Sequence, residues 1–444
     1  MVSFFHSYDL RGKYPDEIGL EEAEKVGKAY GTFTDAEKVL VGRDGRIHAE
    51  EVTEAFINGI ISTGTDVAYT GMVPSPVVYF GQVENNFESA AVVTASHNPS
   101  QYTGFKFNLE NALAMSREGG MEKIQNIYEE ENFDKGQGSQ NSIDLIKKYI
   151  STVKSKVGSL DQNVVINCGN GVTGVLAHEM FEELGCNVEM VNEEVDGNFP
   201  NHLADPGNEE AQETLENEMT DDEIGILFDG DGDRAGFILP NYGYVGEDEL
   251  LALYAKYILN KQNVGKVVYD LRASKLVPEQ IRGAGGEPIE SRVGHTFISE
   301  QIHDDEEVVF AGELSGHFYF PAYDFPWDDG LFAAALLLKI ASEKDLIEEL
   351  NNFEEYPVSP ELRIDCPHKA KPKIIESTKE HYSDFDLNTK DGVKISFENG
   401  WALVRPSNTE PKMSVRCEAD TKEDLEKITA DVEEKVREFI RKNN

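Results

Sequence analysis

The sequence has few basic residues, few cysteines and no long apolar run. Only 41 Lys and Arg residues accompany 83 Asp and Glu residues, which gives a formal net charge of −42 over 444 residues. Because nucleic-acid phosphates are bound by clustered Lys and Arg, this composition argues against a nucleic-acid partner. The most apolar run, residues 331–338, ends at Lys339, whereas roughly 20 apolar residues are needed to span a bilayer. We therefore expect no membrane partner either.

The cysteine pattern and the N-terminus both favour a cytoplasmic location. Cys168, Cys186, Cys366 and Cys417 are too sparse for a disulfide framework, and none belongs to a CxxC pair. Reduced thiols are therefore a better interpretation than a zinc site. The first residues, MVSFFHSYDLRGK, lack a basic segment followed by an apolar one, so no secretory signal is expected.

The excess of acidic residues suggests a protein of a salt-rich cytoplasm. Hydrophobic residues make up 39% of the chain, so we expect a folded protein with an acidic surface rather than a disordered acidic tail. At about 1 M salt the Debye length falls to roughly 3 Å, which screens the repulsion among surface acids. We interpret the composition as halophilic; the alternative is an acidic protein from an organism of ordinary salinity.

Strand-like and helix-like segments alternate along most of the chain, which favours an α/β fold. A related plan occurs three times, each time opening with an apolar strand and a polar loop: KVLVGRDGR, NVVINCGNG and KVVYDLRAS. Each copy later carries a second strand that ends in a loop rich in functional groups: TASHNP, FDGDGDR and AGELSGH. Three such units would place three loops around a shared cleft. The last part, with several strands and a charged helix at 421–442, is typical of a small α+β domain.

The loop FDGDGDR places three carboxylates between two apolar strands. Asp229, Asp231 and Asp233 alternate with glycines, so the three side chains can converge on one ion, and oxygen ligands favour Mg²⁺ or Mn²⁺. An EF-hand is excluded, because Arg234 and Pro240 occupy the positions that require Gly and Glu. A solvated acidic turn is the alternative, and the flanking apolar strands argue against it.

The stretch VVTASHNP presents Ser96 and His97 at the end of an apolar run. A phosphoserine would offer strong acceptor oxygens to a nearby dication, and Arg234 beside the acidic loop suggests an anionic ligand. A Ser-His hydrolase is one alternative, but the chain has no G-x-S-x-G elbow around Ser96. Simple capping of the strand end by Ser96 is the other.

Taken together, these motifs resemble those of the α-D-phosphohexomutases, the superfamily of phosphoglucomutases and phosphomannomutases. TASHNPSQYTGFKF is similar to the phosphoserine loop, FDGDGDR to the metal loop, GELSGH to the sugar-recognition loop and RPSNTEP to the phosphate-binding loop. SYDLRGKYP, VGRDGR, INCGNGVTG, DGNFPNHLADPGN and RVGHTF also match, in the order of the family and from end to end. The resemblance implies three tandem α/β domains of similar topology with mixed sheets, at 1–150, 151–247 and 248–354, and an α+β domain at 355–444, around a central cleft.

The resemblance also implies a set of site residues. Ser96 would carry the transferable phosphoryl group, and Mg²⁺ would bind the Ser96 phosphate together with Asp229, Asp231 and Asp233. The other residues expected near the reacting oxygen are Arg11, His97, Lys106 and Arg234. The residues expected to bind substrate are Arg272, Gly294, His295, Glu313, Ser315, His317, Arg405, Ser407, Asn408 and Thr409.

Some of these residues are expected to have distinct roles. Lys106 is expected to act as a general acid or base, with its pKa lowered by the like charge of Arg11. Glu313 and Ser315 are expected to bind sugar hydroxyls, whereas the loop around Arg405 should hold the phosphate that is not reacting. Three positions depart from the usual family pattern: Thr103, Val293 and Arg272. The last replaces a common lysine, which puts its substrate contact in doubt.

The implied function is a Mg²⁺-dependent mutase that interconverts hexose 1-phosphate and hexose 6-phosphate, of mannose or glucose, through a hexose 1,6-bisphosphate that also serves as activator. GELSGH is similar to the phosphomannomutase/phosphoglucomutase branch, and a phosphoglucosamine mutase is the alternative within the family. From other classes, a phosphatase with Asp229 as nucleophile and a non-enzymatic acidic metal-binding protein remain open. Sugar phosphates are the expected small-molecule partners.

The halophilic interpretation makes a prediction about stability. The melting temperature should rise as KCl or NaCl is increased toward molar concentrations, because screening weakens the repulsion among the excess acids. Thermal unfolding at a series of salt concentrations measures this. A melting temperature that stays flat or falls over that range contradicts the interpretation.

Overall fold

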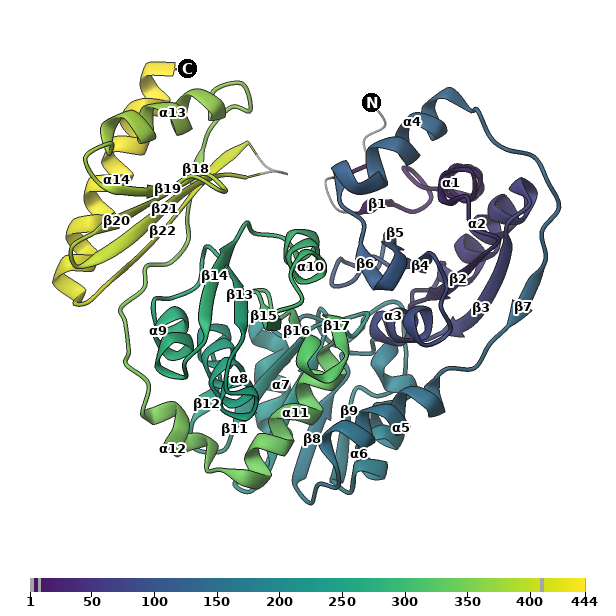
Figure 1. Ribbon diagram of the computed structural model, residues 1–444, viewed down its shortest axis with the longest axis horizontal. Coiled ribbons are helices and arrows are strands. Elements are labelled where there is room, and N and C mark those ends of the chain that lie inside the picture. Colours follow the sequence, from purple (N-terminus) through teal and green to yellow (C-terminus); the bar gives the residue numbers. More distant parts are fainter. Residues whose placement is uncertain (1–3, 7–8, 408–410, 444) are drawn as a thin grey trace.

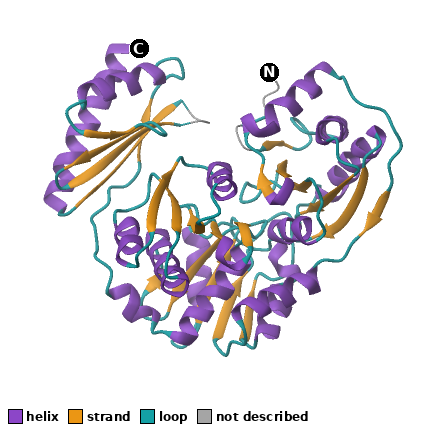
Figure 2. Cartoon of the chain, in the orientation of Figure 1, coloured by secondary structure: helices purple, strands orange, loops and turns teal. Residues whose placement is uncertain are grey.

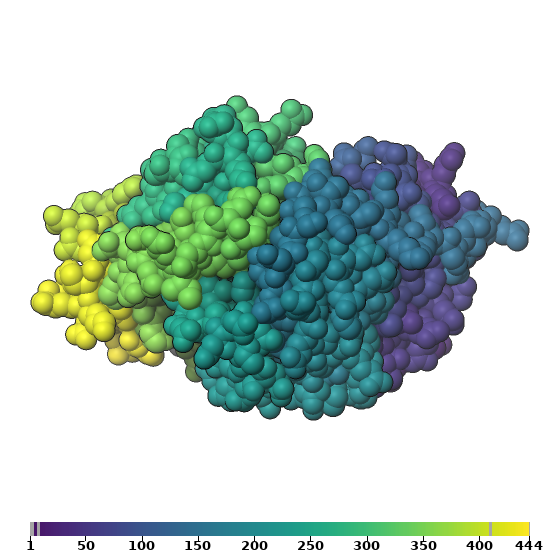
Figure 3. Space-filling view, turned by 90° about the horizontal axis from the view of Figure 1, so that it is seen from below, coloured from purple at the N-terminus to yellow at the C-terminus, as the bar shows by residue number. Residues whose placement is uncertain are grey.

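The structure is a computed structural model that describes residues 4–6, 9–407 and 411–443. Four β-sheets with their helices follow one another in chain order, and we call the corresponding units domains I to IV. Figure 1 shows them along an arc, with domain I at one end, domain IV at the other and domains II and III between them. Helices flank each sheet (Figure 2), and seen from below the four colour regions succeed one another along the long axis (Figure 3).

Domain I contains a seven-stranded sheet of order β1-β5-β4-β2-β3-β7, with β6 paired to β5. Its strands are β1 Leu10–Lys13, β2 Lys38–Arg43, β3 Asp66–Met72, β4 Ala90–Val93, β5 Tyr102–Leu109, β6 Leu113–Ala114 and β7 Gln140–Ser142. Its helices are α1 Leu20–Thr34, α2 Ala49–Thr63, α3 Ser75–Glu84 and α4 Glu122–Glu130.

Domains II and III contain five-stranded sheets of order β12-β11-β10-β8-β9 and β14-β13-β15-β16-β17. The elements of domain II are α5 Ile146–Val157, β8 Asn163–Asn167, α6 Ala177–Leu184, β9 Asn187–Val191, α7 Glu209–Glu218, β10 Ile224–Phe228, β11 Ala235–Leu239 and β12 Gly243–Tyr244. Those of domain III are α8 Glu247–Gln262, β13 Lys266–Asp270, α9 Leu276–Gly283, β14 Glu287–Ser291, α10 His295–Asp304, β15 Val308–Gly312, β16 Phe318–Phe320, β17 Phe325–Asp328, α11 Gly330–Glu343 and α12 Leu346–Asn351. The domain boundary expected at residue 150 lies within α5.

The three α/β domains share one topology, as the sequence predicted. In each, a central strand pairs in parallel with the strand that precedes the functional loop: β2 with β4, β8 with β10, and β13 with β15. The next strand then turns back and pairs antiparallel, as β5, β11 and β16 do. The mixed sheets are therefore confirmed. TASHNP, FDGDGDR and GELSGH consequently follow the carboxyl ends of equivalent strands, where α/β sheets commonly place ligand sites.

Domain IV has a different plan, in which every strand pairs antiparallel in the order β18-β22-β21-β20-β19. Its strands are β18 Leu362–Asp365, β19 Asp386–Asn388, β20 Val393–Phe397, β21 Gly400–Pro406 and β22 Lys412–Ala419. Its helices are α13 Lys371–His381 and α14 Lys422–Asn443. This sheet-plus-helix unit confirms the expected α+β domain, and the RPSNTEP motif begins at the end of β21 and precedes β22 in the sequence.

The apolar cores show how the domains are joined. One continuous cluster includes residues of domains I, II and III, such as Phe80, Phe228 and Phe332. Domain IV has a core of its own, and a small cluster of Leu271, Trp401 and Leu403 connects it to domain III. In the described parts of the chain, none of the helices is both long and apolar enough to cross a membrane. Domains I to III therefore share a core, whereas domain IV is attached through a smaller contact.

Helices α1 and α2 cross at two glycines that allow their backbones to touch. A Cβ added at Gly27 would lie 2.0 Å from the carbonyl oxygen of Phe56, and one added at Gly59 would lie 2.1 Å from that of Glu24. Real Cβ atoms do not approach so closely, so any larger residue would force these helices apart.

We therefore expect Gly27→Ala to destabilise domain I by roughly 1–3 kcal/mol, the usual cost of overpacking a close contact. The melting temperature of the purified variant measures the effect. Gly283→Ala is the matched control, because a Cβ there has no atom within 4 Å, and its melting temperature should stay the same or rise slightly. Equal stability of the two variants would contradict the packing argument.

Candidate active site

Ser96 lies in the loop between β4 and β5, three residues after the strand ends at Val93. Its backbone is left-handed, with φ of 48°, which is uncommon for a residue with a side chain. The Ser96 N–H donates to Thr94 Oγ1 at 2.8 Å. Only 2% of the Ser96 surface is exposed. Such strained residues occur often at functional sites, where the surroundings hold them in place.

Arg46, in the loop after β2, holds this conformation. Its Nη2 donates to the carbonyl oxygens of Ser96 at 2.7 Å and Asn98 at 2.6 Å, and its Nη1 to those of Pro99 at 2.8 Å and Tyr102 at 3.1 Å. The guanidinium is buried and pairs with Asp44. Sequence analysis assigned no role to Arg46, although VGRDGR was among the motifs. The sequence feature that could have indicated this role is the pair of charged residues, Asp44 and Arg46, close after the buried strand β2.

The acidic loop FDGDGDR forms the hairpin turn between β10 and β11. Asp229, Asp231 and Asp233 are fully buried, and each offers an oxygen within 4.8 Å of the others. Within the described part of the chain, Asp231 Oδ1 and Asp233 Oδ1 accept no hydrogen bond, although the His317 imidazole lies 3.6 Å from Asp233 Oδ1. Because a buried carboxylate oxygen is costly to leave unpaired, this donor set fits a hard dication such as Mg²⁺.

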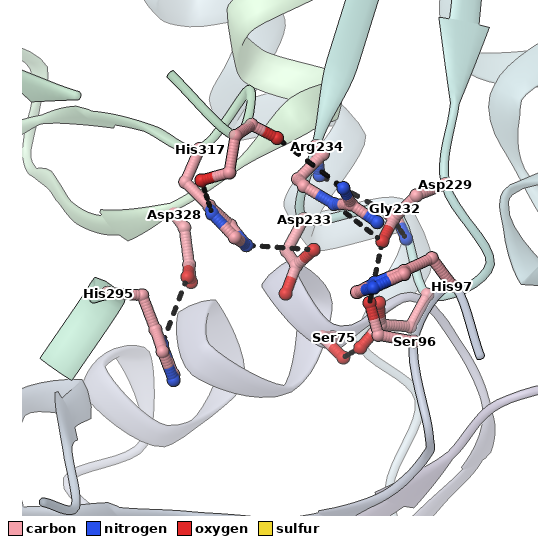
Figure 4. A network of polar contacts seen from close by, with 12 residues as sticks. Ser75, Ser96, His97, Asp229, Gly232, Asp233, Arg234, His295, His317 and Asp328 are labelled. Carbon is pink, nitrogen blue, oxygen red and sulfur yellow. Dashed lines mark hydrogen bonds and ion pairs between the residues drawn. The ribbon is translucent and has the colours of Figure 1, made fainter. Parts of the chain in front are cut away.

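The serine loop and the acidic loop are in direct contact. Ser96 Oγ donates to Asp229 Oδ2 at 2.8 Å and lies 3.2 Å from His97 Nδ1 (Figure 4). The approach requires glycine at position 230, because a Cβ there would lie 2.4 Å from the Ser96 carbonyl oxygen. Ser75, at the start of α3, donates its hydroxyl to Asp231 Oδ2 at 2.7 Å. Domain I therefore supplies both the serine and a support for the acidic loop.

Lys106, on β5, points into the same cluster. Its Nζ donates to Asp231 Oδ2 at 2.7 Å and also to Asp233 Oδ2. Burial disfavours the charged ammonium, but these two carboxylates raise the pKa of Lys106 well above its ordinary value. The expectation that the pKa of Lys106 is lowered was therefore wrong, because the two carboxylates in contact with its ammonium favour the charged form.

Arg234 and His97 are two further ionisable residues close to Ser96 and Asp229. Arg234 Nε pairs with Asp229 Oδ2 at 3.1 Å, and its Nη1 with Asp205 at 3.3 Å. Burial, together with the positive charges of Arg234 and Arg11, lowers the pKa of His97 to about 2, so the imidazole is neutral. Arg11 contacts the serine loop through its Nη1, which donates to Asn98 Oδ1 at 2.7 Å.

The loop after β15 brings the residues expected to recognise the sugar to the other side of Asp233. His317 Nε2 lies 3.6 Å from Asp233 Oδ1, and His317 Nδ1 lies 3.3 Å from Glu313 Oε2 and 2.9 Å from Ser315 Oγ. Burial alone would lower the pKa of His317, but Asp233 and Glu313 raise it to about 10. The Gly294 N–H donates to Glu313 Oε1 at 2.9 Å. The GELSGH loop and the RVGHTF loop are thus tied together.

A further acid in this region was not anticipated from the sequence. Asp328, at the end of β17, lies 3.5 Å from His295 Nδ1 (Figure 4), and its ligand atoms lie within 4.8 Å of those of Asp233 and His317. The sequence FPWDDG contains two adjacent acids and carries no signal that singles out Asp328 for this role.

The remaining substrate-binding candidates lie farther along the chain. Arg272 pairs with Asp270, Nη2 to Oδ2 at 2.6 Å, at the carboxyl end of β13. Arg405 lies on β21 and pairs with Asp391 at 2.8 Å, and the Ser407 N–H donates to the Lys412 carbonyl oxygen at 3.0 Å. The candidates Asn408 and Thr409 lie outside the described residues.

Comparison with known proteins covers all four domains. Models of the phosphoglucomutase/phosphomannomutase family match domain I at residues 3–135, domain II at 142–243, domain III at 246–356 and the C-terminal domain at 361–435. The chain is 34% identical over 438 residues to a phosphomannomutase/phosphoglucomutase of Pseudomonas aeruginosa, covering 96% of this chain and 94% of that protein. It is 36% identical over 448 residues to a phosphomannomutase of Methanocaldococcus jannaschii, covering 99% and 97%.

A solved structure agrees with these matches. The crystal structure of a phosphoglucomutase/phosphomannomutase family protein from Burkholderia thailandensis superposes with a TM-score of 0.92 at 30% identity, covering 100% of this chain and 99% of that one. Because family models, relatives and structure all extend over nearly the whole chain, the protein belongs to the phosphoglucomutase/phosphomannomutase family and is a phosphohexomutase, an enzyme of the isomerase class.

Proposed function

We propose that the enzyme interconverts hexose 1-phosphate and hexose 6-phosphate through a phosphoserine at Ser96 and a hexose 1,6-bisphosphate. The observation that carries this proposal is the contact of 2.8 Å between Ser96 Oγ and Asp229 Oδ2, at the meeting of two buried loops. A hydroxyl held there has a donor set for Mg²⁺ on one side and the cations Lys106 and Arg234 nearby. This setting suits a phosphate dianion better than it suits a free hydroxyl.

The chain's own groups would stabilise the transferring phosphoryl group. Mg²⁺ bound by Asp229, Asp231, Asp233 and the Ser96 phosphate would neutralise charge on that group and polarise it. Arg234 is fixed by Asp229 and Asp205, so it needs little rearrangement to face the phosphate. The raised pKa of Lys106 keeps its ammonium charged, so that it would stabilise negative charge near the serine oxygen beside the general acid or base role that we propose for it. The neutral imidazole of His97 can accept a hydrogen bond beside Ser96.

The substrate would be held by loops from domains III and IV. We assign the sugar hydroxyls to Glu313, Ser315 and His317, with Gly294, His295 and Arg272 in support. Arg405 and Ser407, together with Asn408 and Thr409, would bind the phosphate that is not reacting. After the first transfer the bisphosphate has to turn end over end, so that the opposite phosphate returns to Ser96. Separate loops for sugar and phosphate are compatible with both orientations.

Mannose and glucose phosphates are the substrates that we propose, with phosphoglucosamine mutase as the alternative. A coupled assay with mannose, glucose and glucosamine 1-phosphates, each with the corresponding bisphosphate as activator, decides among them. Turnover of glucosamine 1-phosphate alone would favour the alternative. We also propose a cytoplasmic, salt-rich setting, which the acidic composition and the four buried free cysteines support.

The phosphoserine proposal predicts that Ser96 is partly phosphorylated in the isolated enzyme, which intact-mass and peptide analysis can show. Ser96→Ala should lose both the phosphate and essentially all mutase activity, because no phosphoryl group remains to be donated. Ser100→Ala, in the same loop, is the matched control and should keep both. Phosphate on another residue, with Ser96→Ala still active, would refute the mechanism.

The metal proposal predicts loss of activity on chelation and its recovery with Mg²⁺. Asp231→Asn should raise the Mg²⁺ concentration for half-maximal activity by at least about tenfold, because one of three charged ligands is lost. Its melting temperature without metal should fall only modestly, because the ion pair with Lys106 is weakened while the repulsion among the buried carboxylates decreases. Asp221→Asn, an exposed acid of the same domain, is the control. Unchanged Mg²⁺ dependence of Asp231→Asn would show that the metal binds elsewhere.

A further inference from the structure

Polar contacts dominate one part of the junction between domains III and IV. The segment of residues 388–394, which contains the turn between β19 and β20, lies against the end of β14 and the loop that follows it. Glu290 of β14 is the anchor: its carboxylate accepts from Asn388 Nδ2 at 2.8 Å and Lys394 Nζ at 2.6 Å. The Glu290 carbonyl oxygen accepts from Lys390 Nζ at 2.6 Å. These contacts fix the position of the turn on domain III.

Asp391, within the same turn, connects two loops of the candidate site. A single oxygen, Asp391 Oδ2, accepts from Arg405 Nε at 3.0 Å, pairs with Arg405 Nη2 at 2.8 Å and accepts from the Val293 N–H at 3.2 Å. The Asp391 and Arg405 side chains are 16% and 14% exposed, so solvent screens this ion pair only in part. Arg405 belongs to the phosphate-binding loop of domain IV, and Val293 to the RVGHTF loop of domain III.

The connection continues into the sugar-recognition loop. Val293 precedes Gly294, whose N–H donates to Glu313 Oε1 at 2.9 Å. A continuous line of polar contacts therefore runs from the Arg405 guanidinium through Asp391 and the 293–294 backbone to Glu313. Because one carboxylate oxygen serves both the guanidinium and the amide, the orientation of Arg405 is fixed relative to domain III and not only within its own domain.

We propose that Asp391 is a positioning residue of the mutase reaction, which aims Arg405 at the distal phosphate and couples it to the sugar-recognition loop. This inference rests on the proposed role of Arg405 in binding that phosphate. Asp391 does not touch the substrate; it restrains a long side chain that, in so acidic a protein, has many competing carboxylates. Preorganising the guanidinium reduces the rotamer entropy lost when the phosphate binds. Since the same clamp serves both orientations of the substrate, both directions of the reaction depend on it.

The kinetic test compares Asp391→Ala and Asp391→Asn with the unaltered enzyme in both directions. Asp391→Ala should raise KM about tenfold for the 1-phosphate and for the 6-phosphate alike, the usual effect of losing a charge-assisted contact, while kcat stays within about twofold. Asp391→Asn keeps an oxygen acceptor and should show an intermediate KM. Asp384→Asn, an exposed acid of the same domain, is the control and should leave KM unchanged.

A double-mutant cycle separates positioning from a merely structural role. Arg405→Ala should raise KM by itself, and adding Asp391→Ala to it should cause little further change, because the group being positioned is gone. Multiplicative effects of the two changes would mean that they act independently and would overturn the proposal. Ser96 phosphorylation and the melting temperature of Asp391→Asn should match the unaltered enzyme, so that a shift in KM is not a folding defect.

The remaining outcomes are also decisive. A lower KM in the Asp391 variants would mean that the carboxylate competes with the phosphate for Arg405, which contradicts the positioning role. An unchanged KM in both variants, with a raised KM in Arg405→Ala, would overturn the inference and leave the proposed phosphate clamp intact. An unchanged KM in Arg405→Ala would refute the clamp itself, and the inference with it.

Discussion

Three fully buried carboxylates in a single hairpin turn repel one another, and the arrangement of domains I, II and III is built around balancing them. Burial and the charge of Asp233 raise the pKa of Asp229, whereas the positive charges of Lys106 and His317 lower that of Asp233 well below its usual range, against the effect of burial. Lys106 comes from domain I and His317 from domain III. The charge balance of a loop in domain II thus depends on side chains that the two neighbouring domains supply.

The repeated topology explains how three domains can reach one point. Each α/β unit places its functional loop after an equivalent strand, so serine, carboxylates and sugar-recognition residues all occur at carboxyl strand ends. The shared apolar core of domains I to III holds these ends rigidly with respect to one another. Domain IV has a separate core and meets domain III through a small apolar cluster and the contacts of Glu290 and Asp391. In the function that we propose, the chemistry would belong to domains I to III, and recognition of the distal phosphate to domain IV, whose contact with domain III is smaller.

Sequence analysis could identify much of this because the informative motifs are local. FDGDGDR, TASHNP and GELSGH each contain their functional groups within a few consecutive residues. The threefold repeat could be predicted because its strands are short apolar runs in the sequence. Contacts between distant residues could not be deduced. Lys106 lies 125 residues from Asp231, so its real neighbours were unknown and its pKa was assigned the wrong direction. Arg46 was missed for a related reason: it binds backbone carbonyl oxygens, and every residue type has one, so the sequence does not indicate which of them Arg46 contacts.

The central claim is that Ser96 lends a phosphoryl group to the sugar and recovers one from its other end. Single-turnover transfer from enzyme labelled at Ser96 with radioactive phosphate, by exchange with labelled hexose 1,6-bisphosphate, tests this most directly. On mixing with unlabelled hexose 1-phosphate and Mg²⁺, the label should leave the protein and appear in hexose bisphosphate and hexose 6-phosphate. Label that appears only as inorganic phosphate, or that stays on the protein while product forms, would contradict the account.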